Sequence, residues 1–412
     1  MKLKDTVILA FLALKYRRLR SSLTILGVVI GTSLIIILTS QTAGLNEYFV
    51  SKISRTGLNS IFVIPVGRFR ISIYDLATFN NIPGVKRVIP IIRGTAVIAI
   101  ANETVNVQVI GIDSDSLSEL FPGLKLLEGT LPGKYDYVSL VAGYNVAFPV
   151  SNGEDETQQL IVGQPLGIAF RRYRQSSYIA SMIVSGILES YGAITPFPVD
   201  DVVLISLEAA NAVFNKRNYY DAVILIAEDV SLVDQVMEEL KNTYGRRIRS
   251  IAPSQIVETI TSISNQISLF LGLIAAVSLI VASIGTANIM YISVIERTKL
   301  IGLLKALGAT ESTILLLFLM ESALVGLIGG VIGVIAGIAL SHIIGPIILR
   351  SIGLPIMRAP RGRTAIIEVK PVFTVELIFI AFLAALLSGV IAGIIPARRA
   401  AKLDPVKVLR QE

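Results

Sequence analysis

The sequence predicts an α/β membrane protein in which four transmembrane helices carry one large extracytoplasmic domain of mixed α/β structure. Only 16% of its 412 residues are charged and its mean hydropathy is +0.71, far outside the range of soluble domains. Four apolar stretches each supply the roughly 20 residues that a helix needs to cross a bilayer. The basic residues behind the net charge of +7 gather beside these stretches, which is typical of membrane topology and not of a nucleic-acid-binding surface.

The chain begins with a basic segment, residues 1–20, followed by the first predicted span, residues 21–43. Apolar residues at helical spacing and six Lys and Arg residues predict an amphipathic helix on the cytoplasmic membrane surface. A disordered basic tail is the alternative. The apolar core Leu23–Leu38 is longer than that of a cleaved signal peptide, so we expect the first span to be retained.

Residues 44–265 are predicted to form the extracytoplasmic domain, with 22 acidic and 18 basic residues. Two β-α-β halves favour a split ferredoxin-like subdomain, and an insertion between them, about 113–199, is expected to form a small β subdomain. Its Phe and Tyr residues fit either a binding surface or an aromatic core, and RRYRQ at 171–175 fits either a solvated hairpin tip or a ligand patch. The expected elements are strands at 60–66, 202–206, 222–227 and 247–251, helices at 73–81, 207–215 and 232–244, and a hairpin at 85–112.

Three further spans are predicted at residues 266–294, 311–345 and 372–395. Lys and Arg number six before the first span, three in the segment 295–310 and five in the tail 396–412, against five in the loop 346–371. The side with more basic residues is cytoplasmic. We therefore predict a multi-pass protein of the plasma membrane with cytoplasmic N- and C-termini and an extracytoplasmic loop at 346–371.

Small residues recur four apart within the spans, a pattern that lets helices approach closely in lipid. The pattern leaves open whether the partner helix belongs to the same chain or to a second subunit. Few ionisable residues lie in the spans, namely Glu321, His342 and Glu376, so no path for a polar substrate through the bilayer is evident. The glycines predicted to pack helices are Gly27, Gly31, Gly326, Gly330, Gly333, Gly337, Gly389 and Gly393.

Catalytic residues are not apparent. The chain has no Cys and a single His, which excludes disulfides, thiolate sites and a zinc site built on His ligands. The stretch GTLPGKY, residues 129–135, has three residues where a phosphate-binding loop needs four, and it lacks the hydroxyl after the lysine. We expect no catalytic, cofactor-binding or metal-binding residues, and no enzyme activity, in this chain.

The segment 295–310 interrupts two of the longest apolar stretches with charged residues. Its apolar residues recur at helical spacing, Gly308 is suited to end a helix, and Thr310 is suited to begin the next one. These features predict a short amphipathic helix on the cytoplasmic face. From its residues alone, this helix either rests on lipid headgroups or docks in a groove of a cytoplasmic partner.

Two motifs resemble those of a known family. ERTKLIGLLKALGAT, residues 296–310, resembles the ERTREIG and AIGA signature of the MacB/FtsX-type (type VII) ABC transporter permeases, although Leu300 and Leu304 depart from it. PARRAAKLDPVKVLR, residues 396–410, is similar to that family's C-terminal PARRAARLDPVEALR. One span, a large external domain, three spans and a basic tail are also the layout of this family.

The resemblance implies a non-catalytic permease subunit of a MacB-like transporter. ATP and Mg would be bound by a separate ATPase subunit, present in two copies, and a second permease protomer would complete a homo- or heterodimer in membrane lipid. ATP hydrolysis would move the extracytoplasmic domains and export an amphipathic substrate such as a drug, a peptide or a lipid-linked molecule, with an extracytoplasmic adaptor or substrate protein as a further partner. The alternative is an FtsX-like mechanotransmitting signalling subunit that regulates an external enzyme without transport.

The resemblance also implies site residues, by their match to the two motifs. The positions expected to couple to the ATPase are Glu296, Arg297, Lys299, Ile301, Gly302, Leu303, Lys305, Leu307 and Gly308. Those matched in the cytoplasmic tail are Arg398, Arg399, Leu403, Asp404 and Pro405.

Overall fold

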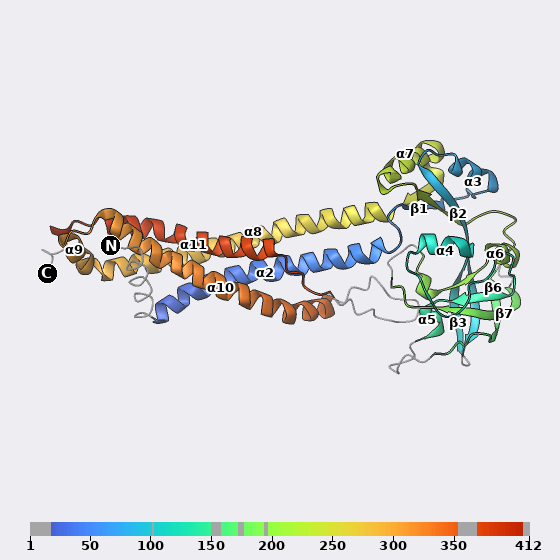
Figure 1. Ribbon diagram of the computed structural model, residues 1–412, viewed down its shortest axis with the longest axis horizontal. Helices are drawn as coiled ribbons and strands as arrows, with labels where there is room; N and C mark the ends of the chain where they lie inside the picture. The colour runs from blue at the N-terminus through green and yellow to red at the C-terminus, as the bar shows by residue number, and fades with distance from the viewer. Residues whose placement is uncertain are drawn as a thin grey trace. The chain divides into compact units, whose positions relative to one another are not determined.

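The computed structural model describes residues 18–100, 103–149, 158–171, 177–192, 197–352 and 369–406. The chain divides into two compact units, which we call the membrane unit and the external unit (Figure 1). The external unit is essentially Glu47–Thr261, close to the predicted range 44–265. Most of the predicted surface helix 1–20, most of the loop 346–371 and most of the RRYRQ stretch lie outside the described residues.

Four long apolar helices confirm the four predicted spans. Each of these helices is longer than the apolar stretch expected to lie in lipid, because the helix continues into the more polar residues at its ends. Their bounds are Arg18–Ser54 for α2, Pro253–Glu296 for α8, Glu311–Ile352 for α10 and Val375–Ala401 for α11.

Helix α10 packs closely on α2 through small residues spaced four apart. A Cβ added at Gly333 would lie 2.7 Å from the Cβ of Thr32, and one at Gly337 would lie 2.8 Å from the Cβ of Ile36. Only glycine permits this approach, which is how helices associate in lipid. The same spacing continues in Gly329 against Val28 and in Ser341, whose hydroxyl lies 2.8 Å from that of Ser40.

The other predicted packing glycines also lie against a helix of the same chain. A Cβ at Gly326 would lie 2.9 Å from the carbonyl oxygen of Ala385, and one at Gly389 would lie 2.7 Å from that of Ser322. These contacts join α10 to α11. The remaining contacts are Gly330 with Ala385, Gly393 with Ser322, Gly31 with Leu279 and Gly27 with Ala282.

One part of the external unit is the predicted ferredoxin-like subdomain. Its antiparallel sheet has the order β10-β1-β9-β2, which is the order of a split β-α-β fold. Two helices cover one face, and Phe79, Val236 and Leu240 are buried there. The bounds are Ser60–Pro65 (β1), Ile73–Asn80 (α3), Val85–Ile100 (β2), Ala222–Ala227 (β9), Val233–Tyr244 (α7) and Ile248–Ile251 (β10).

The inserted β subdomain is wider than the predicted range 113–199. Strand β3 pairs with the second half of β2, and β8 pairs with β3 and β5. Consequently 202–206 and 207–215, expected in a ferredoxin half, belong to the insertion. Its elements are β3 (Glu103–Gly111), α4 (Ser114–Leu120), β4 (Leu126–Gly129), β5 (Ser139–Ala142), α5 (Tyr144–Ala147), β6 (Pro165–Arg171), β7 (Ser177–Leu188), β8 (Val202–Ile205) and α6 (Leu207–Phe214).

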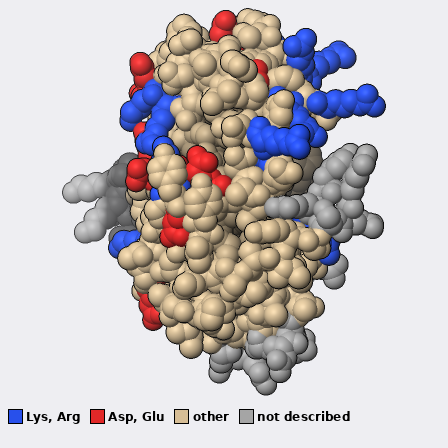
Figure 2. Space-filling model, turned by 90° about the vertical axis from the view of Figure 1, so that its right-hand side faces the viewer, with Lys and Arg blue, Asp and Glu red and all other residues tan. Residues whose placement is uncertain are grey.

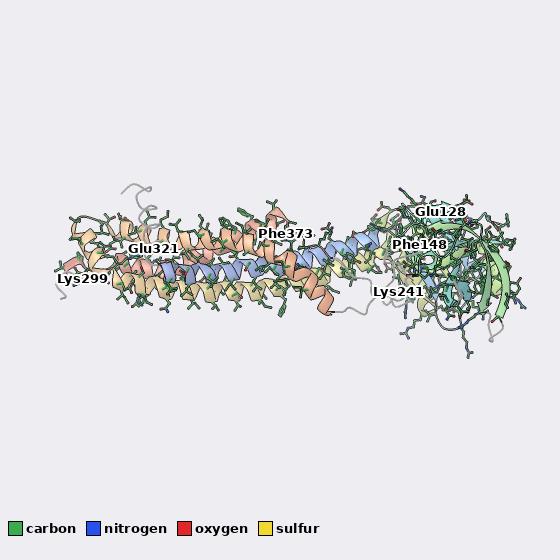
Figure 3. The ribbon with its side chains drawn as sticks, turned by 90° about the horizontal axis from the view of Figure 1, so that it is seen from below. Glu128, Phe148, Lys241, Lys299, Glu321 and Phe373 are labelled. Carbon is green, nitrogen blue, oxygen red and sulfur yellow. The ribbon has the colours of Figure 1, made fainter. Side chains whose placement is uncertain are left out.

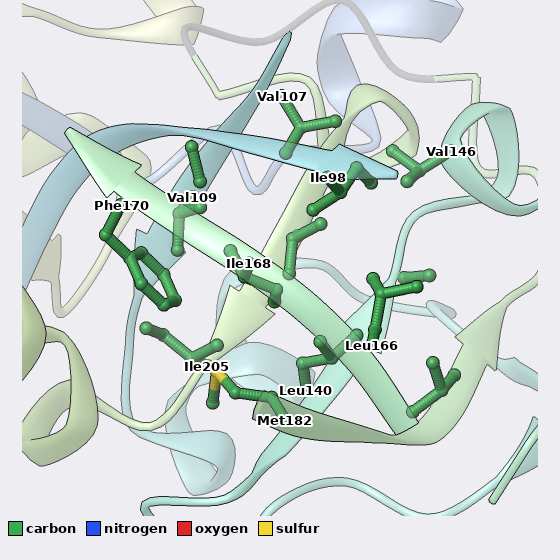
Figure 4. Packing of buried hydrophobic residues seen from close by; sticks show 14 of the residues in the cluster. Ile98, Val107, Val109, Leu140, Val146, Leu166, Ile168, Phe170, Met182 and Ile205 are labelled. Atoms are coloured by element: carbon green, nitrogen blue, oxygen red, sulfur yellow. The ribbon is translucent and has the colours of Figure 1, made fainter. Parts of the chain in front are cut away.

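Strand β2 is shared by both subdomains of the external unit. Its residues 85–91 pair with β9, and its residues 92–100 pair with β3. The insertion has its own apolar core, in which Ile98, Ile168 and Phe170 are fully buried (Figure 4). Gly94 lies where β2 passes from one sheet to the other, and the ring of Phe214 at the end of α6 occupies the space that a side chain there would need.

Candidate functional site

The predicted amphipathic helix is present as α9, Thr298–Ala306, at one end of the membrane unit (Figure 1). Gly308 ends it with a φ of +97°, a conformation that favours glycine. The backbone N–H of Gly308 donates to Lys305, and that of Ala309 donates to Leu304, which together form a Schellman motif. The hydroxyl of Thr310 then accepts from the backbone N–H of Thr313 and caps α10.

One face of α9 is packed inside the membrane unit. Ile301 is 2% exposed and belongs to a cluster with Phe318 of α10 and Ala397 of α11. Gly302 is also buried, and Leu304 is half-buried against the same cluster. We call this the inner face of α9.

Lys305 fixes the inner face to the end of α11. Its Nζ donates to the carbonyl oxygens of Ala401 and Leu403, each at 2.8 Å. The last carbonyls of a helix lack partners within the helix and carry partial negative charge, so an ammonium group is well suited to them. The Lys305 side chain is only 11% exposed, and Glu311 lies 3.9 Å from its Nζ.

Two further contacts join the surrounding helices. Arg297, at the end of α8, lies with its Nη1 3.4 Å from Oε2 of the buried Glu321 on α10. The Arg399 guanidinium of α11 lies 5.0 Å from the centre of the Tyr291 ring of α8. Figure 3 shows Lys299 near the end of the bundle and Glu321 farther along it. These two contacts join α8 to α10 and to α11, the same three helices whose residues form the apolar cluster around Ile301.

The opposite face of α9 is apolar and exposed. Leu300, Leu303 and Leu307 are 53%, 49% and 78% exposed, and their spacing of three and four residues places them on one stripe of the helix. Lys299 and Glu296 are exposed beside them. We call this stripe the outer face of α9. A helix that presents a row of apolar anchors is the ligand of helix-in-groove recognition.

The predicted coupling residues thus separate into two groups. Glu296, Lys299, Leu303, Leu307 and Gly308 are exposed, whereas Ile301 and Gly302 are buried and Arg297 and Lys305 are half-buried in contacts within the chain. Leu300 was not among the predicted coupling residues because it departs from the family motif, although its helical spacing to Leu303 and Leu307 places it on the outer face.

The tail motif lies beside the inner face. Arg398 and Arg399 are exposed, Leu403 packs at the edge of the apolar cluster, and the Asp404 carboxylate accepts from the backbone N–H of Val406 at 2.9 Å. Pro405 lies within that turn. Among the described residues, no group of His, Asp and Glu side chains could hold a metal ion.

Comparison with known families shows which family the chain belongs to. The family model of the MacB-like periplasmic core domain matches residues 21–243, and that of the FtsX-like permease C-terminal region matches residues 272–405. The first match alone covers more than half of the chain. The chain therefore belongs to the MacB/FtsX-like family of ABC transporter permeases.

Individual relatives are also named as ABC transporter permeases or as export ATP-binding/permease proteins. The chain is 29% identical to an uncharacterized ABC transporter permease of Methanocaldococcus jannaschii, over 100% of this chain and 99% of that one. It is 30% identical to the macrolide export ATP-binding/permease protein MacB of Marinobacter nauticus, over 95% of this chain and 58% of that one. It is 28% identical to the pyoverdine export ATP-binding/permease protein PvdT of Pseudomonas aeruginosa, over 100% and 59%. The chain thus spans about three fifths of these two longer relatives.

A solved structure to which part of this chain is similar is the periplasmic region of MacB from Actinobacillus actinomycetemcomitans. It covers 51% of this chain and 95% of that one, with 14% identity and a TM-score of 0.36.

Proposed function

We propose that this chain is the permease subunit of a MacB-like exporter and that the outer face of α9 docks in a groove of a separate ATPase subunit, two copies per complex. The observation that carries the proposal is the row of exposed leucines on a helix whose other face is fixed within the membrane unit. Full burial of an exposed leucine side chain supplies about 1.5–3 kcal/mol, and these leucines, which are 49–78% exposed, have roughly half of that or more still to gain. An apolar groove on a cytoplasmic partner would recover this free energy.

The contacts around α9 support the proposal that this helix transmits motion from the ATPase to the membrane unit and does not only hold the two proteins together. Lys305 joins α9 to α11, and Arg297 joins the end of α8 to α10. A displacement applied to the outer face would therefore be shared among three helices instead of bending α9 away from the bundle. ATP and Mg, bound by the partner, would drive that displacement.

The proposed orientation places α9 and both termini in the cytoplasm of a plasma-membrane protein. The support is the excess of Lys and Arg in the first 20 residues, the α9 segment and the tail. The external unit then lies outside the cell membrane, and the match to a periplasmic core domain supports this placement.

The proposal also includes a second permease protomer, the same chain or a related one, packed against α8. Only a small share of the apolar span of α8 is buried within the membrane unit. Leu269, Leu273 and Val281 are exposed, and space for a side chain is open at Gly272 and Gly285. Small residues with open space are where a second helix could approach closely, with lipid covering the rest.

Export of an amphipathic molecule is favoured over signalling by the relatives named for export. Transfer of that activity to this chain is part of the proposal. The few ionisable residues of the spans fit a substrate that is handled at the external unit. An FtsX-like signalling role predicts the same ATPase coupling without substrate movement, and a transport assay in vesicles separates the two.

The test of docking compares two variants that each add one negative charge. Leu303→Asp places a carboxylate on the outer face, and Asn242→Asp places one on the exposed surface of α7 in the external unit. The tagged chain is purified from its native membrane and vanadate-sensitive ATP hydrolysis in the eluate is measured. Burying an unpaired carboxylate is unfavourable, so Leu303→Asp should lower the recovered activity at least about tenfold, and Asn242→Asp should not. Full activity with Leu303→Asp would refute docking by this face.

A further inference from the structure

The external unit contains a cleft of about 710 Å³ where β2 passes from one sheet to the other. Its walls come from the strands around that crossing, from the end of α6 and from residues 214–221 that follow it. This volume lies within the range of about 300–1,000 Å³ that holds a small organic molecule. No part of the proposed ATPase coupling uses this cleft.

The walls of the cleft are strongly basic although the external unit as a whole is acidic. Arg70, Arg93, Arg171 and Lys216 line it, against a single carboxylate, Asp221. Residues 44–265 overall have 22 acidic and 18 basic residues, so the positive charge here is locally concentrated. Figure 2 shows Lys and Arg side chains on both sides of the upper half of this face, with the larger group on the right.

The basic residues of the cleft are not all neutralised. Lys216 pairs with Asp221 at 2.7 Å. The Asp221 carboxylate also accepts from the backbone N–H of Arg93 at 2.8 Å. Within the described part of the chain, Arg70 and Arg171 form no ion pair, and both are exposed. Two guanidinium groups therefore remain available to an anion, and guanidinium groups favour carboxylate, sulfonate and phosphate oxygens.

The cleft also has aromatic walls. Phe69, Phe214, Tyr219 and Tyr220 line it, and the Arg70 guanidinium lies 5.9 Å from the centre of the Tyr219 ring. A flat apolar group can stack on such rings while an attached anion reaches the guanidinium groups. The lining therefore combines the two kinds of contact that an aromatic anion would use.

The segment that supplies Lys216 is held in an uncommon backbone conformation. Asn215 ends α6 in the left-handed conformation that is common at helix ends. Arg217 and Asn218, which follow it, also have left-handed φ values of 53° and 62°, although neither is glycine. Asn211 holds this segment, because its side-chain amide donates to the Asn218 side chain at 2.7 Å. Left-handed residues cost on the order of 1 kcal/mol each and concentrate at sites of function. This geometry fixes the wall of the cleft before any ligand binds.

We propose that this cleft binds an organic anion that carries a flat apolar body, with Arg70 and Arg171 holding the anionic group and Tyr219 contacting the apolar body. The inference does not depend on the proposed ATPase coupling. An aromatic carboxylate of about the size of a three-ring dye matches the volume, charge and lining.

Carboxyfluorescein is a suitable probe because it is anionic and soluble, its three-ring xanthene is flat, and it fluoresces strongly. The full-length chain in lipid nanodiscs is titrated into the dye without nucleotide or ATPase, and fluorescence anisotropy reports binding. Charge-assisted hydrogen bonds suggest that Arg70→Glu and Arg171→Glu each weaken binding by about tenfold or more. Rhodamine 123, a cationic dye of the same ring skeleton, should bind much more weakly than carboxyfluorescein.

The matched control is Arg249→Glu, the same change at an exposed position of edge strand β10 that does not line the cleft. It should leave carboxyfluorescein binding within about twofold. Equal weakening by Arg249→Glu would assign the binding to the overall charge of the unit and overturn the proposal. So would an absence of carboxyfluorescein binding, or binding that Arg70→Glu and Arg171→Glu leave unchanged. Because no ATPase is present, none of these results bears on docking at α9.

Discussion

Replacing Lys305 by methionine tests whether the inner face of α9 depends on the ammonium group. Met keeps most of the apolar stem, so the substitution removes mainly the charge and its two 2.8 Å hydrogen bonds to Ala401 and Leu403. Hydrogen bonds from a charged donor contribute about 1.5–3 kcal/mol each. Methionine has no charge, so the variant also avoids the free-energy cost of removing the ammonium group from water on folding. The difference leaves a net loss of about 2 kcal/mol in the free energy of local opening.

Amide hydrogen exchange of the peptide that contains α9 measures this cost directly. A loss of about 2 kcal/mol should speed exchange of its amides by about thirtyfold, since each 1.4 kcal/mol corresponds to a factor of ten. Lys299→Met is the matched control, because Lys299 lies exposed on the same helix. It should change exchange by less than about threefold. Equal exchange in the two variants would refute the view that Lys305 holds α9 to α11.

Two further predictions concern helix packing and pH. Gly333→Leu should lower the midpoint of thermal aggregation, because its side chain would overlap Thr32 at a cost of about 1–3 kcal/mol, whereas Ile335→Leu, at an exposed position of the same helix, should not. A result in which both variants aggregate alike would argue against the α2–α10 contact. Burial raises the pKa of the Asp200 carboxyl, although the N–H groups of Tyr191 and Gly192 oppose this. The folded state then holds a proton that the unfolded state releases, so stability should fall as pH rises from about 4 through the raised pKa. Hydrogen exchange of β7, measured across this pH range, should report this loss of stability in the unmodified chain and should not report it in Asp200→Asn.

Local signals in the sequence predicted much of this structure. Hydropathy and charge identified the four long helices described in the membrane unit, because lipid burial depends on a continuous stretch of about 20 residues. Gly308 and Thr310 were predicted as helix ends, and the φ of +97° at Gly308 and the cap at Thr310 agree with this. Each of these two helix ends is determined by residues only a few positions away in the sequence. The ferredoxin-like subdomain was predicted for the same reason, since its helices and strands alternate regularly along the chain.

The pairing of strands could not be predicted in the same way. Residues 202–205 have the apolar run of a buried strand, and that property is the same whichever sheet they join. The structure pairs them with β3 and β5 instead of with the ferredoxin sheet. The basic cleft was missed for a related reason. Arg70, Arg171 and Lys216 are far apart in sequence and meet only because β2 is shared by two sheets.

The two faces of α9 illustrate what a motif match does and does not specify. Ile301 and Leu303 are chemically alike and two residues apart, yet one is 2% exposed and the other 49%. Only the helices packed around α9 decide which of them is covered. Gly302 is buried, so its replacement by a large residue would disturb packing and docking at once and could not separate them. Substitutions of the inner face should therefore alter hydrogen exchange first, and substitutions of the outer face should alter ATPase recovery while exchange stays unchanged. If one set of substitutions altered both measurements equally, the distinction between holding and docking residues would fail.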